Sequence, residues 1–236
     1  MNIVILTGAG ISAESGLATF RGDGGVWEDR RIEDVCTPEA LERNPDLVCT
    51  FYDERRQEAA TAKPNAAHIA LVALEAHWAA EGKGSFLLVT QNVDDLHERA
   101  GSRQVLHMHG SLNAASCIEC GWHGPRYGRM EDNRECGICG REALRPDIVL
   151  FGEAPRHMGQ IEAALRTCDL FVAIGTSGTV YPAAGFAEIA KAHRAVTHRF
   201  DVTKPDSTIF DTHHVGPASQ SVPGWVDELI GMKRSG

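Results

Sequence analysis

The chain has 236 residues, a formal net charge of −9 and 43% hydrophobic residues. A chain of this length can bury a full core, either as one domain or as a large and a small one. The negative charge argues against a broad nucleic-acid-binding surface, which needs clustered lysine and arginine. It agrees with lysine-rich protein partners and also with the ordinary acidity of many bacterial-type proteins.

The first predicted element is a strand, Ile3–Thr7, that runs through the turn Gly8-Ala9-Gly10 into helix-compatible residues that include Ala13. Glycines at such a turn let the backbone approach a ligand, and the N–H groups of a helix N-terminus attract phosphate. Gly-x-Gly after a strand also occurs in ordinary tight turns, so the motif alone leaves both interpretations open.

Features that would place the chain outside the cytoplasm are not visible in the sequence. The first strand begins so early that we expect no signal or transit segment. No apolar run approaches the ~20 residues that a bilayer-spanning helix needs. We therefore expect a cytoplasmic protein that does not contact membranes and works as a monomer.

Further strands alternate with helices along the chain. Apolar runs predict strands at Phe86–Thr90, Leu170–Ile174 and Ala195–Phe200, and helices are predicted at Ala66–Ala80 and Pro182–His193. Such alternation indicates an α/β fold with a Rossmann-like parallel sheet covered by helices on both faces. Sheets of this kind bind ligands at the carboxyl ends of their strands.

Two segments break the alternation, residues 26–65 and 113–143. The first is polar and helical, and the second is short, rich in glycine and cysteine, and too poor in apolar residues to fold unaided. We expect both to form a small domain, made of a helical module and a zinc ribbon, inserted into a large Rossmann-like domain of residues 1–25, 66–112 and 144–236.

The helical module carries a possible anion-binding pair. Tyr52 and Arg55 are three residues apart on a helix predicted over Pro45–Ala60, and so share a face. A hydroxyl and a guanidinium together suit a carboxylate. The competing interpretation is an exposed helix with an unpaired arginine, which is what we expect of the neighbouring Arg56.

Four of the seven cysteines form two Cys-x-x-Cys pairs, Cys117 with Cys120 and Cys136 with Cys139. In a chain without a secretion signal such pairs indicate a metal. Four thiolates close a tetrahedron around one zinc ion and leave no position for water, so we expect a structural site. A redox Cys-x-x-Cys normally uses one pair. The balanced charges of the intervening loop disfavour nucleic-acid binding.

Polar and small residues follow the predicted strands and should converge on one crevice. Gln91, Asn92 and Asp94 follow the second strand, and Gly175-Thr176-Ser177 ends the third. Without other motifs, the Gln-Asn-x-Asp segment is better read as a polar turn that caps a helix. His109 can act as a general base, although a lone histidine is more often structural.

These motifs, in this order, closely resemble the sirtuin family of NAD-dependent protein deacylases, from Met1 to about Pro223. The segments that carry the resemblance are Thr7 to Gly16, Leu17-Ala18-Thr19-Phe20-Arg21-Gly22, Thr90-Gln91-Asn92-Val93-Asp94, His107-Met108-His109-Gly110, the two cysteine pairs, Phe151-Gly152-Glu153 and Gly175-Thr176-Ser177. The resemblance implies NAD as co-substrate, one structural zinc ion per chain, and acyl-lysine-bearing proteins or peptides as substrates.

The resemblance also implies roles for individual residues. His109 would activate the ribose, Asp94 and the Val93 backbone would hold the nicotinamide carboxamide, and products would be free lysine, nicotinamide and O-acyl-ADP-ribose. Phe20 would shield the site from water. The expected cofactor-binding residues are Gly8, Ala9, Gly10, Ala13, Phe20, Arg21, Gln91, Asn92, Val93, Asp94, Gly175, Thr176, Ser177 and Ala218.

On the substrate side, the resemblance implies that an extended Phe151-Gly152-Glu153 and the loop near Val180 sandwich the peptide as an added strand. The Tyr52-x-x-Arg55 pair resembles the subgroup that removes succinyl, malonyl and glutaryl groups. Cys36 stands where that subgroup has a small residue that leaves space for the acyl group. We therefore expect a preference for acidic acyl groups, together with deacetylase activity.

Two segments depart from the family pattern. Ala18 replaces a common proline, and Val202 and Lys204 stand where relatives have the Asn and the Glu of Asn-x-Glu-Pro, whose Asn contacts the adenosine ribose. This second departure keeps a non-catalytic NAD or ADP-ribose sensor open as an alternative. A plain deacetylase and a protein ADP-ribosyltransferase are alternatives among enzymes, and a hydride-transferring dehydrogenase is disfavoured by the Asp94 and ribose-base arrangement.

Overall fold

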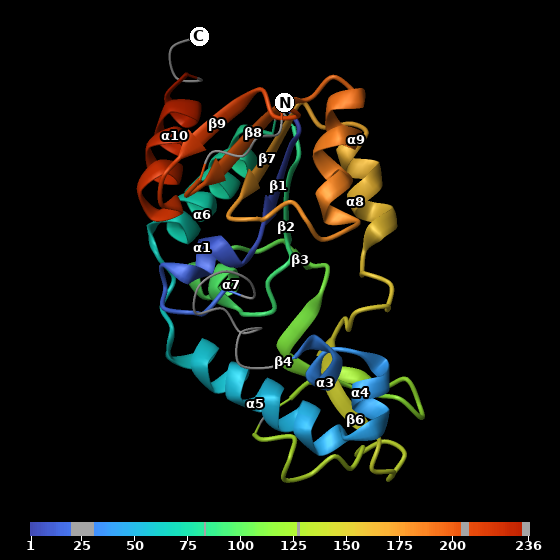
Figure 1. Ribbon diagram of the computed structural model, residues 1–236. Coiled ribbons are helices and arrows are strands. Elements are labelled where there is room, and N and C mark those ends of the chain that lie inside the picture. Colours follow the sequence, from blue (N-terminus) through green and yellow to red (C-terminus); the bar gives the residue numbers. More distant parts are fainter. Residues whose placement is uncertain (20–30, 83, 127, 204–207, 233–236) are drawn as a thin grey trace.

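The computed structural model describes residues 1–19, 31–82, 84–126, 128–203 and 208–232. It contains two sheets, each with its own set of helices (Figure 1). The larger sheet is parallel and lies in the upper part of the view, and the smaller sheet is antiparallel and lies below it. No helix of the described ranges combines the length and apolar character needed to cross a membrane.

The larger sheet has the strand order β3-β2-β1-β7-β8-β9, with every neighbouring pair parallel. Numbered within this sheet, the order is 3-2-1-4-5-6, that of a dinucleotide-binding doubly wound fold. Its strands are β1 (Ile3–Thr7), β2 (Phe86–Thr90), β3 (Val105–His107), β7 (Leu170–Ile174), β8 (Val196–Asp201) and β9 (Thr212–Val215). The predicted α/β class and the four predicted strands are confirmed, the last with a shift of one residue.

Alternate residues of β1 pack on opposite faces of the sheet, as a strand buried on both sides requires. Ile3 and Ile5 pack with α6 (Ala66–Glu81) and α10 (Ala218–Met232). Val4 and Leu6 belong to the cluster on the other face, where α8 (Met158–Leu165) and α9 (Phe186–Ala192) lie. Figure 1 shows these helix pairs on either side of the sheet.

The helix predicted from Pro182 begins differently from the expectation. A 3-10 turn at Ala183–Gly185 precedes α9, which starts at Phe186 and ends at Ala192. Proline at the first turn satisfies the rule for a helix start, but it does not specify which helix type the first turn adopts. The helix Ala66–Ala80 is confirmed as α6, which ends at a left-handed Gly82.

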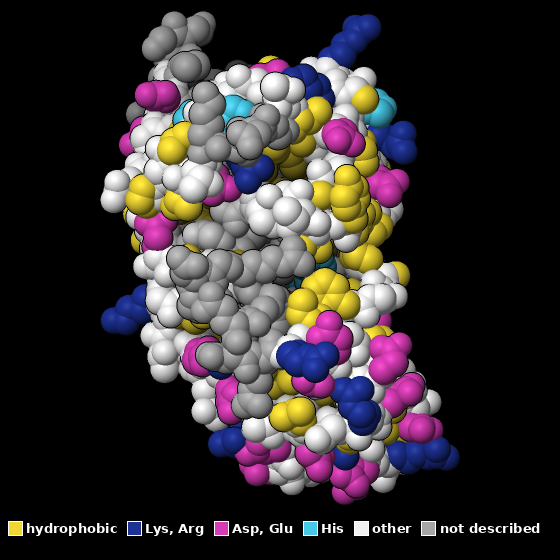
Figure 2. Space-filling model, in the orientation of Figure 1, with side chains coloured by type: hydrophobic (Ala, Val, Ile, Leu, Met, Phe, Trp, Pro, Cys, Tyr) yellow, Lys and Arg dark blue, Asp and Glu magenta, His cyan; other side chains and the backbone are white. Residues whose placement is uncertain are grey.

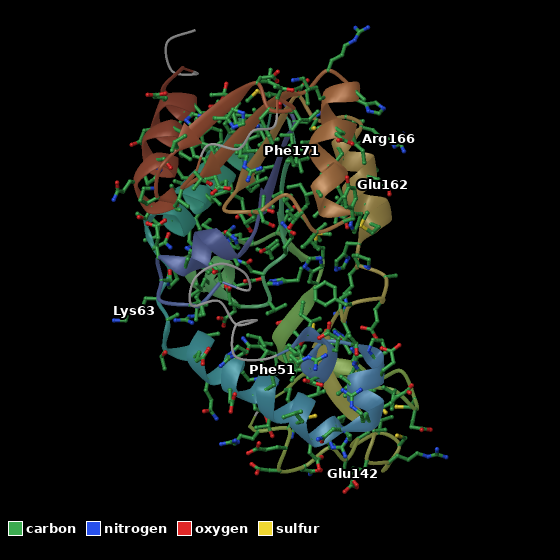
Figure 3. The ribbon with its side chains drawn as sticks, viewed as in Figure 1. Phe51, Lys63, Glu142, Glu162, Arg166 and Phe171 are labelled. Carbon is green, nitrogen blue, oxygen red and sulfur yellow. The ribbon has the colours of Figure 1, made fainter. Side chains whose placement is uncertain are left out.

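The smaller lobe packs three helices against the antiparallel sheet β5-β4-β6. Its elements are α3 (Ile32–Val35), α4 (Pro38–Arg43), α5 (Pro45–Thr61), β4 (Gly110–Cys117), β5 (His123–Pro125) and β6 (Leu144–Ile148). The Thr37 and Asn44 side chains cap α4 and α5, and a proline follows each cap at the start of its helix. Phe51, labelled in Figure 3, comes from the buried face of α5. The domain boundaries remain a prediction.

Arg56 is not the exposed, unpaired arginine that the sequence suggested. Its guanidinium pairs with the buried Asp53 and donates to the backbone carbonyls of Leu112 and Gly128. Asp53 also accepts bonds from the backbone N–H groups of the loop at Met130. The pair therefore ties α5 to the loop between the two cysteine pairs, a tertiary role that helix periodicity does not reveal.

Candidate active site and metal site

A cavity of about 420 Å³ lies at the carboxyl ends of β1, β2, β7 and β8, where it meets the smaller lobe. Its volume falls within the ~300–1,000 Å³ of small-molecule sites. The predicted residues that line it are Gly8, Ala9, Gly10, Tyr52, Gln91, Asn92, Val93, His109, Phe151, Gly152, Glu153, Gly175, Thr176, Ser177, Val180 and Ala218. Residues far apart in the chain are thus brought to one place.

Other predicted residues lie elsewhere. Arg55 and Asp94 line a neighbouring cavity of about 50 Å³, which Tyr52 and Asn92 also line. Ala13 belongs to α1 (Ala9–Ala13) and lines neither cavity. Phe20 and Arg21 lie outside the described residues, so their predicted roles stay predictions. Lys204 does so as well.

The two glycine turns at the cavity pack directly against each other. The Gly10 N–H donates to the Gly175 carbonyl at 2.8 Å. A Cβ on Gly10 would lie 2.7 Å from the Gly175 Cα, and a Cβ on Gly175 would lie 2.4 Å from the Ile11 nitrogen. Gly175 also has a φ of +60°. Only glycine permits this approach, which leaves open backbone lining the cavity.

A buried hydrogen-bond chain runs beneath the cavity. The Asn92 amide donates to the Ser12 hydroxyl at 3.0 Å, and that hydroxyl donates to the Asp94 carboxylate at 3.0 Å. Burial raises the pKa of Asp94, although the Ser12 hydroxyl and the Leu96 N–H both donate to it. Ser12 is a member of the site that sequence reasoning missed, since serine in a first helical turn signals nothing unusual.

His109 lies where the chain leaves β3 and enters β4. Its Nδ1 is 3.1 Å from the Gln91 carbonyl oxygen. A carbonyl can only accept, so Nδ1 carries the proton and Nε2 keeps a free lone pair. Burial lowers the pKa of His109, so the ring is neutral at neutral pH. The geometry thus provides a base that lines the cavity.

The glycine after His109 has a packing reason. Gly110 has a φ of +87°, and a Cβ there would lie 2.0 Å from the Asp147 carbonyl oxygen. The neighbouring His107 faces away from the cavity: its two ring nitrogens contact the Asn92 carbonyl at 3.1 Å and the Glu98 carboxylate at 2.7 Å. Glu98 raises the pKa of His107 against the opposing effect of burial. His107 therefore supports the Gln91–Asp94 loop from behind.

At one end of the cavity the structure brings in a residue that the sequence analysis passed over. Asp201 ends β8 and lines the cavity together with Val202. Its carboxylate accepts from Arg199 Nη2 at 2.7 Å, and Arg199 Nη2 also donates to the Thr176 carbonyl at 3.1 Å. Aligning the Asn-x-Glu-Pro motif of the family at its proline places Val202, and not Asp201, at the position that contacts the adenosine ribose. The signal that would have found Asp201 is its place at the carboxyl end of the strand.

At the end of the cavity facing the smaller lobe, the two residues of the predicted anion-binding pair have separate partners. The Tyr52 hydroxyl donates to Cys36 Sγ at 3.1 Å. Arg55 pairs with Glu58 at 2.6 Å and lies over the Phe51 ring, 5.2 Å from its centroid. Of this pair, Tyr52 lines both cavities and Arg55 lines the smaller one alone, so Tyr52 stands between the larger space and the one that Arg55 lines.

The predicted extended conformation of Phe151-Gly152-Glu153 is wrong in this structure. The Glu153 N–H donates to the Leu150 carbonyl at 3.0 Å, which closes a turn, and Gly152 has a φ of +100°. The Glu153 carboxylate pairs with Arg145 at 2.6 Å and also accepts from the Leu150 N–H. These contacts stabilise the turn. The apolar residues before the turn give no indication of these contacts in the sequence.

The four paired cysteines form a cluster at the far end of the smaller lobe. All four sulfurs lie within 4.8 Å of one another, with Cys117 to Cys139 and Cys120 to Cys136 each at 3.7 Å. Zinc–sulfur bonds of about 2.3 Å in a tetrahedron place sulfurs about 3.8 Å apart. The donor set therefore fits one structural zinc ion. Figure 2 shows acidic and basic side chains intermixed over this lobe, without a basic patch on that face.

Comparisons with known proteins agree with this geometry. The family model described as "Sir2 family" matches residues 8–182. A protein named "NAD-dependent protein deacylase" from Bdellovibrio bacteriovorus is 52% identical over 97% of both chains. One of the same name from Caulobacter vibrioides is 49% identical over 98% of this chain and 97% of its own. A solved Sir2 homologue–NAD complex has a TM-score of 0.84 at 35% identity, covering 99% of this chain and 90% of the other.

Proposed function

This chain belongs to the Sir2 family, and from that premise we propose that it is an NAD-dependent protein-lysine deacylase that prefers acidic acyl groups. The observation that carries the proposal is the convergence at one cavity of three features. These are the packed glycine turns of Gly10 and Gly175, a neutral His109 with a free Nε2, and the Tyr52 hydroxyl. A plain turn or a structural histidine does not require this convergence.

NAD, when bound, supplies an activated bond between nicotinamide and ribose, whose cleavage drives transfer of the acyl group. The backbone around Gly8, Gly10 and Gly175 would hold the phosphates, because these glycine turns leave open backbone beside the cavity at the carboxyl ends of strands. Asp94 and the Val93 backbone would hold the carboxamide, since the buried Ser12 hydroxyl fixes the Asp94 carboxylate and the neighbouring Asn92 amide.

Asp201 would receive the adenosine ribose. A carboxylate can accept from both hydroxyls of a ribose diol, as acidic residues do in other dinucleotide sites. The Arg199 guanidinium donates to this carboxylate at 2.7 Å and orients it. This assignment removes the main reason to favour a non-catalytic sensor, because a polar partner for the ribose is present in spite of Val202.

His109 acts as the base toward a ribose hydroxyl. Its Nδ1–H is fixed by the Gln91 carbonyl, so Nε2 is the atom that takes the proton. Because Gln91 Nε2 also donates to the Thr176 hydroxyl at 2.9 Å, the segment that orients His109 is anchored to the turn after β7. This arrangement orients the imidazole before any ligand arrives.

The acidic-acyl preference rests on Tyr52 and Arg55. Burying an unpaired carboxylate is costly, so a pocket that accepts a succinyl group needs donors. A carboxylate that reaches Tyr52 lies beside the space that Arg55 lines. Arg55 must then break its ion pair with Glu58 and pair with the acyl carboxylate instead. The Glu58 side chain is about half exposed, so it can turn into water.

Replacing Arg55 tests this preference. Removing one member of a desolvated charged pair costs about 2–5 kcal/mol. Because Arg55 is a quarter exposed and already has Glu58 as a partner, we expect the lower end. Arg55→Met should lower kcat/KM for succinyl-lysine roughly 30-fold, chiefly through KM, and leave acetyl-lysine turnover nearly unchanged.

The assay is parallel kinetics on matched succinyl and acetyl peptides. Arg166→Met is the matched control, because Arg166 is an exposed arginine directly after α8, remote from α5 (Figure 3). Equal losses on both peptides in Arg55→Met would show that Arg55 supports the fold or the cofactor site, and the acidic-acyl proposal would fail.

A further inference from the structure

The hydrogen bond between Tyr52 and Cys36 is an unusual arrangement for a binding pocket. Both residues line the larger cavity, and the Tyr52 hydroxyl donates to Cys36 Sγ at 3.1 Å. Both are buried, with 3% of Tyr52 and 7% of Cys36 exposed. The Tyr52 hydroxyl, which we propose to contact the acyl group, therefore already has a hydrogen-bond partner in the protein.

The Cys36 sulfur is a weak acceptor for the Tyr52 hydroxyl. Burial raises the pKa of the Cys36 thiol, so the sulfur is neutral at neutral pH. A neutral sulfur is a weak acceptor, and a hydrogen bond to a charged acceptor is about twice as strong as one between neutral groups. A buried hydroxyl left with no acceptor is costly. The sulfur thus satisfies Tyr52 without binding it tightly.

Two backbone contacts fix the position of the sulfur. Cys36 follows α3, and its N–H donates to the Ile32 carbonyl at 2.8 Å. Its own carbonyl accepts from the Phe151 N–H at 2.9 Å. Phe151 belongs to the segment proposed to face the peptide. The Cys36 sulfur is therefore held between the acyl side of the cavity and the peptide side.

We propose that Cys36 is a specificity-determining residue, whose sulfur acts as an exchangeable acceptor for the Tyr52 hydroxyl. With a neutral acyl group in place, the hydroxyl stays on Cys36 and no buried polar group is left without a partner. With an acidic acyl group, the Tyr52 hydroxyl donates its hydrogen bond to the acyl carboxylate instead of to the sulfur. The same pocket then accepts both classes of acyl group. This inference rests on the proposed acyl-lysine function.

Removing the Cys36 sulfur should increase the preference for acidic over neutral acyl groups. In the natural protein an acidic acyl group must displace the hydroxyl from sulfur, whereas acetyl need not. Cys36→Ala removes that competition, so the ratio of kcat/KM for succinyl-lysine to that for acetyl-lysine should rise roughly three- to ten-fold, the range of one net hydrogen bond. In a Tyr52→Phe background the same substitution should leave the ratio unchanged, because no hydroxyl remains.

The experiment measures this ratio for the natural protein, Cys36→Ala, Tyr52→Phe and the double variant. Cys168→Ala is the matched control, a buried cysteine that lines neither cavity and donates to the Leu165 carbonyl; its ratio should equal the natural one. An unchanged or lower ratio in Cys36→Ala overturns the proposal. So does an equal rise in the Tyr52→Phe background, which would mean that only the removed volume matters.

A second measurement needs no substrate and separates this proposal from the proposed function. Urea unfolding of the same four proteins gives the coupling between the two side chains. The coupling should correspond to a three- to ten-fold change in the unfolding constant, and additive effects overturn the proposed hydroxyl–sulfur contact. Absence of succinyl removal by the natural protein would refute the acidic-acyl function, and the unfolding cycle would still decide whether Cys36 holds Tyr52.

Discussion

Replacing His109 by alanine should nearly abolish acyl removal while leaving the fold intact. General-base catalysis contributes roughly 10²–10⁴-fold in rate. The structure favours the upper half of that range, because Nδ1 is fixed by the Gln91 carbonyl at 3.1 Å and Nε2 has a defined direction. Among the described residues the His109 side chain makes one hydrogen bond, to the Gln91 carbonyl, so thermal unfolding of the variant should change little.

The pH profile of the natural protein gives a second reading of the same residue. Burial lowers the pKa of His109 below its usual 6.5, and the neutral form is the base. The activity should therefore fall as the pH drops through that lowered pKa, because protonation of Nε2 removes the base. A high-pH limb is expected from His107, whose pKa Glu98 raises and whose charged form supports the Gln91–Asp94 loop.

The assay is kcat/KM for one acyl-lysine peptide at saturating NAD between pH 5 and 9, for the natural protein and His109→Ala. His193→Ala is the matched control, because His193 is an exposed histidine at the end of α9. If His109→Ala retains more than about a tenth of the natural turnover, or if the acidic limb lies above pH 7, the assignment of His109 as the base is wrong.

Two further predictions follow from the metal cluster and the adenosine end of the cavity. Cys136→Ser should lose zinc and lower the unfolding temperature, because the four thiolates stabilise a segment with little core; elemental analysis checks this, and protein purified without chelator that contains no stoichiometric zinc would contradict it. Asp201→Ala should raise the KM for NAD roughly ten-fold with little change in kcat, as the loss of one charge-assisted contact implies; an unchanged KM would remove Asp201 from the site.

The parts of the fold that the sequence predicts are those with a local signal. β1, β2 and β7 are short apolar runs, and α4 and α5 begin at the caps Thr37 and Asn44. Elements with mixed composition were missed. β9 reads Thr-His-His-Val, and α10 contains Pro223, so neither has the pattern of its class. Their structure comes from packing on β8 and α6.

The same distinction holds for the site. Spacing alone predicts the four-cysteine cluster, since two turns of the same form must present their sulfurs together. The partners of Tyr52 and Arg55 could not be predicted, because Cys36 and the local Glu58 compete with a ligand only once the lobe is folded. Asp201 was missed because the Asn-x-Glu-Pro motif was aligned at its proline, which places Val202 at the ribose position. In the folded sheet the residue that faces the ligand is instead set by where β8 ends, and β8 ends at Asp201.

The measurement that tests the central claim most directly is mass spectrometry of products from the natural protein with NAD and a panel of acyl-lysine peptides. The account predicts that peptide deacylation requires NAD, that nicotinamide and O-acyl-ADP-ribose form in equal amounts with the free-lysine peptide, and that succinyl and malonyl peptides react faster than acetyl. Deacylation without NAD, or NAD consumption that leaves every acyl peptide intact, would contradict it.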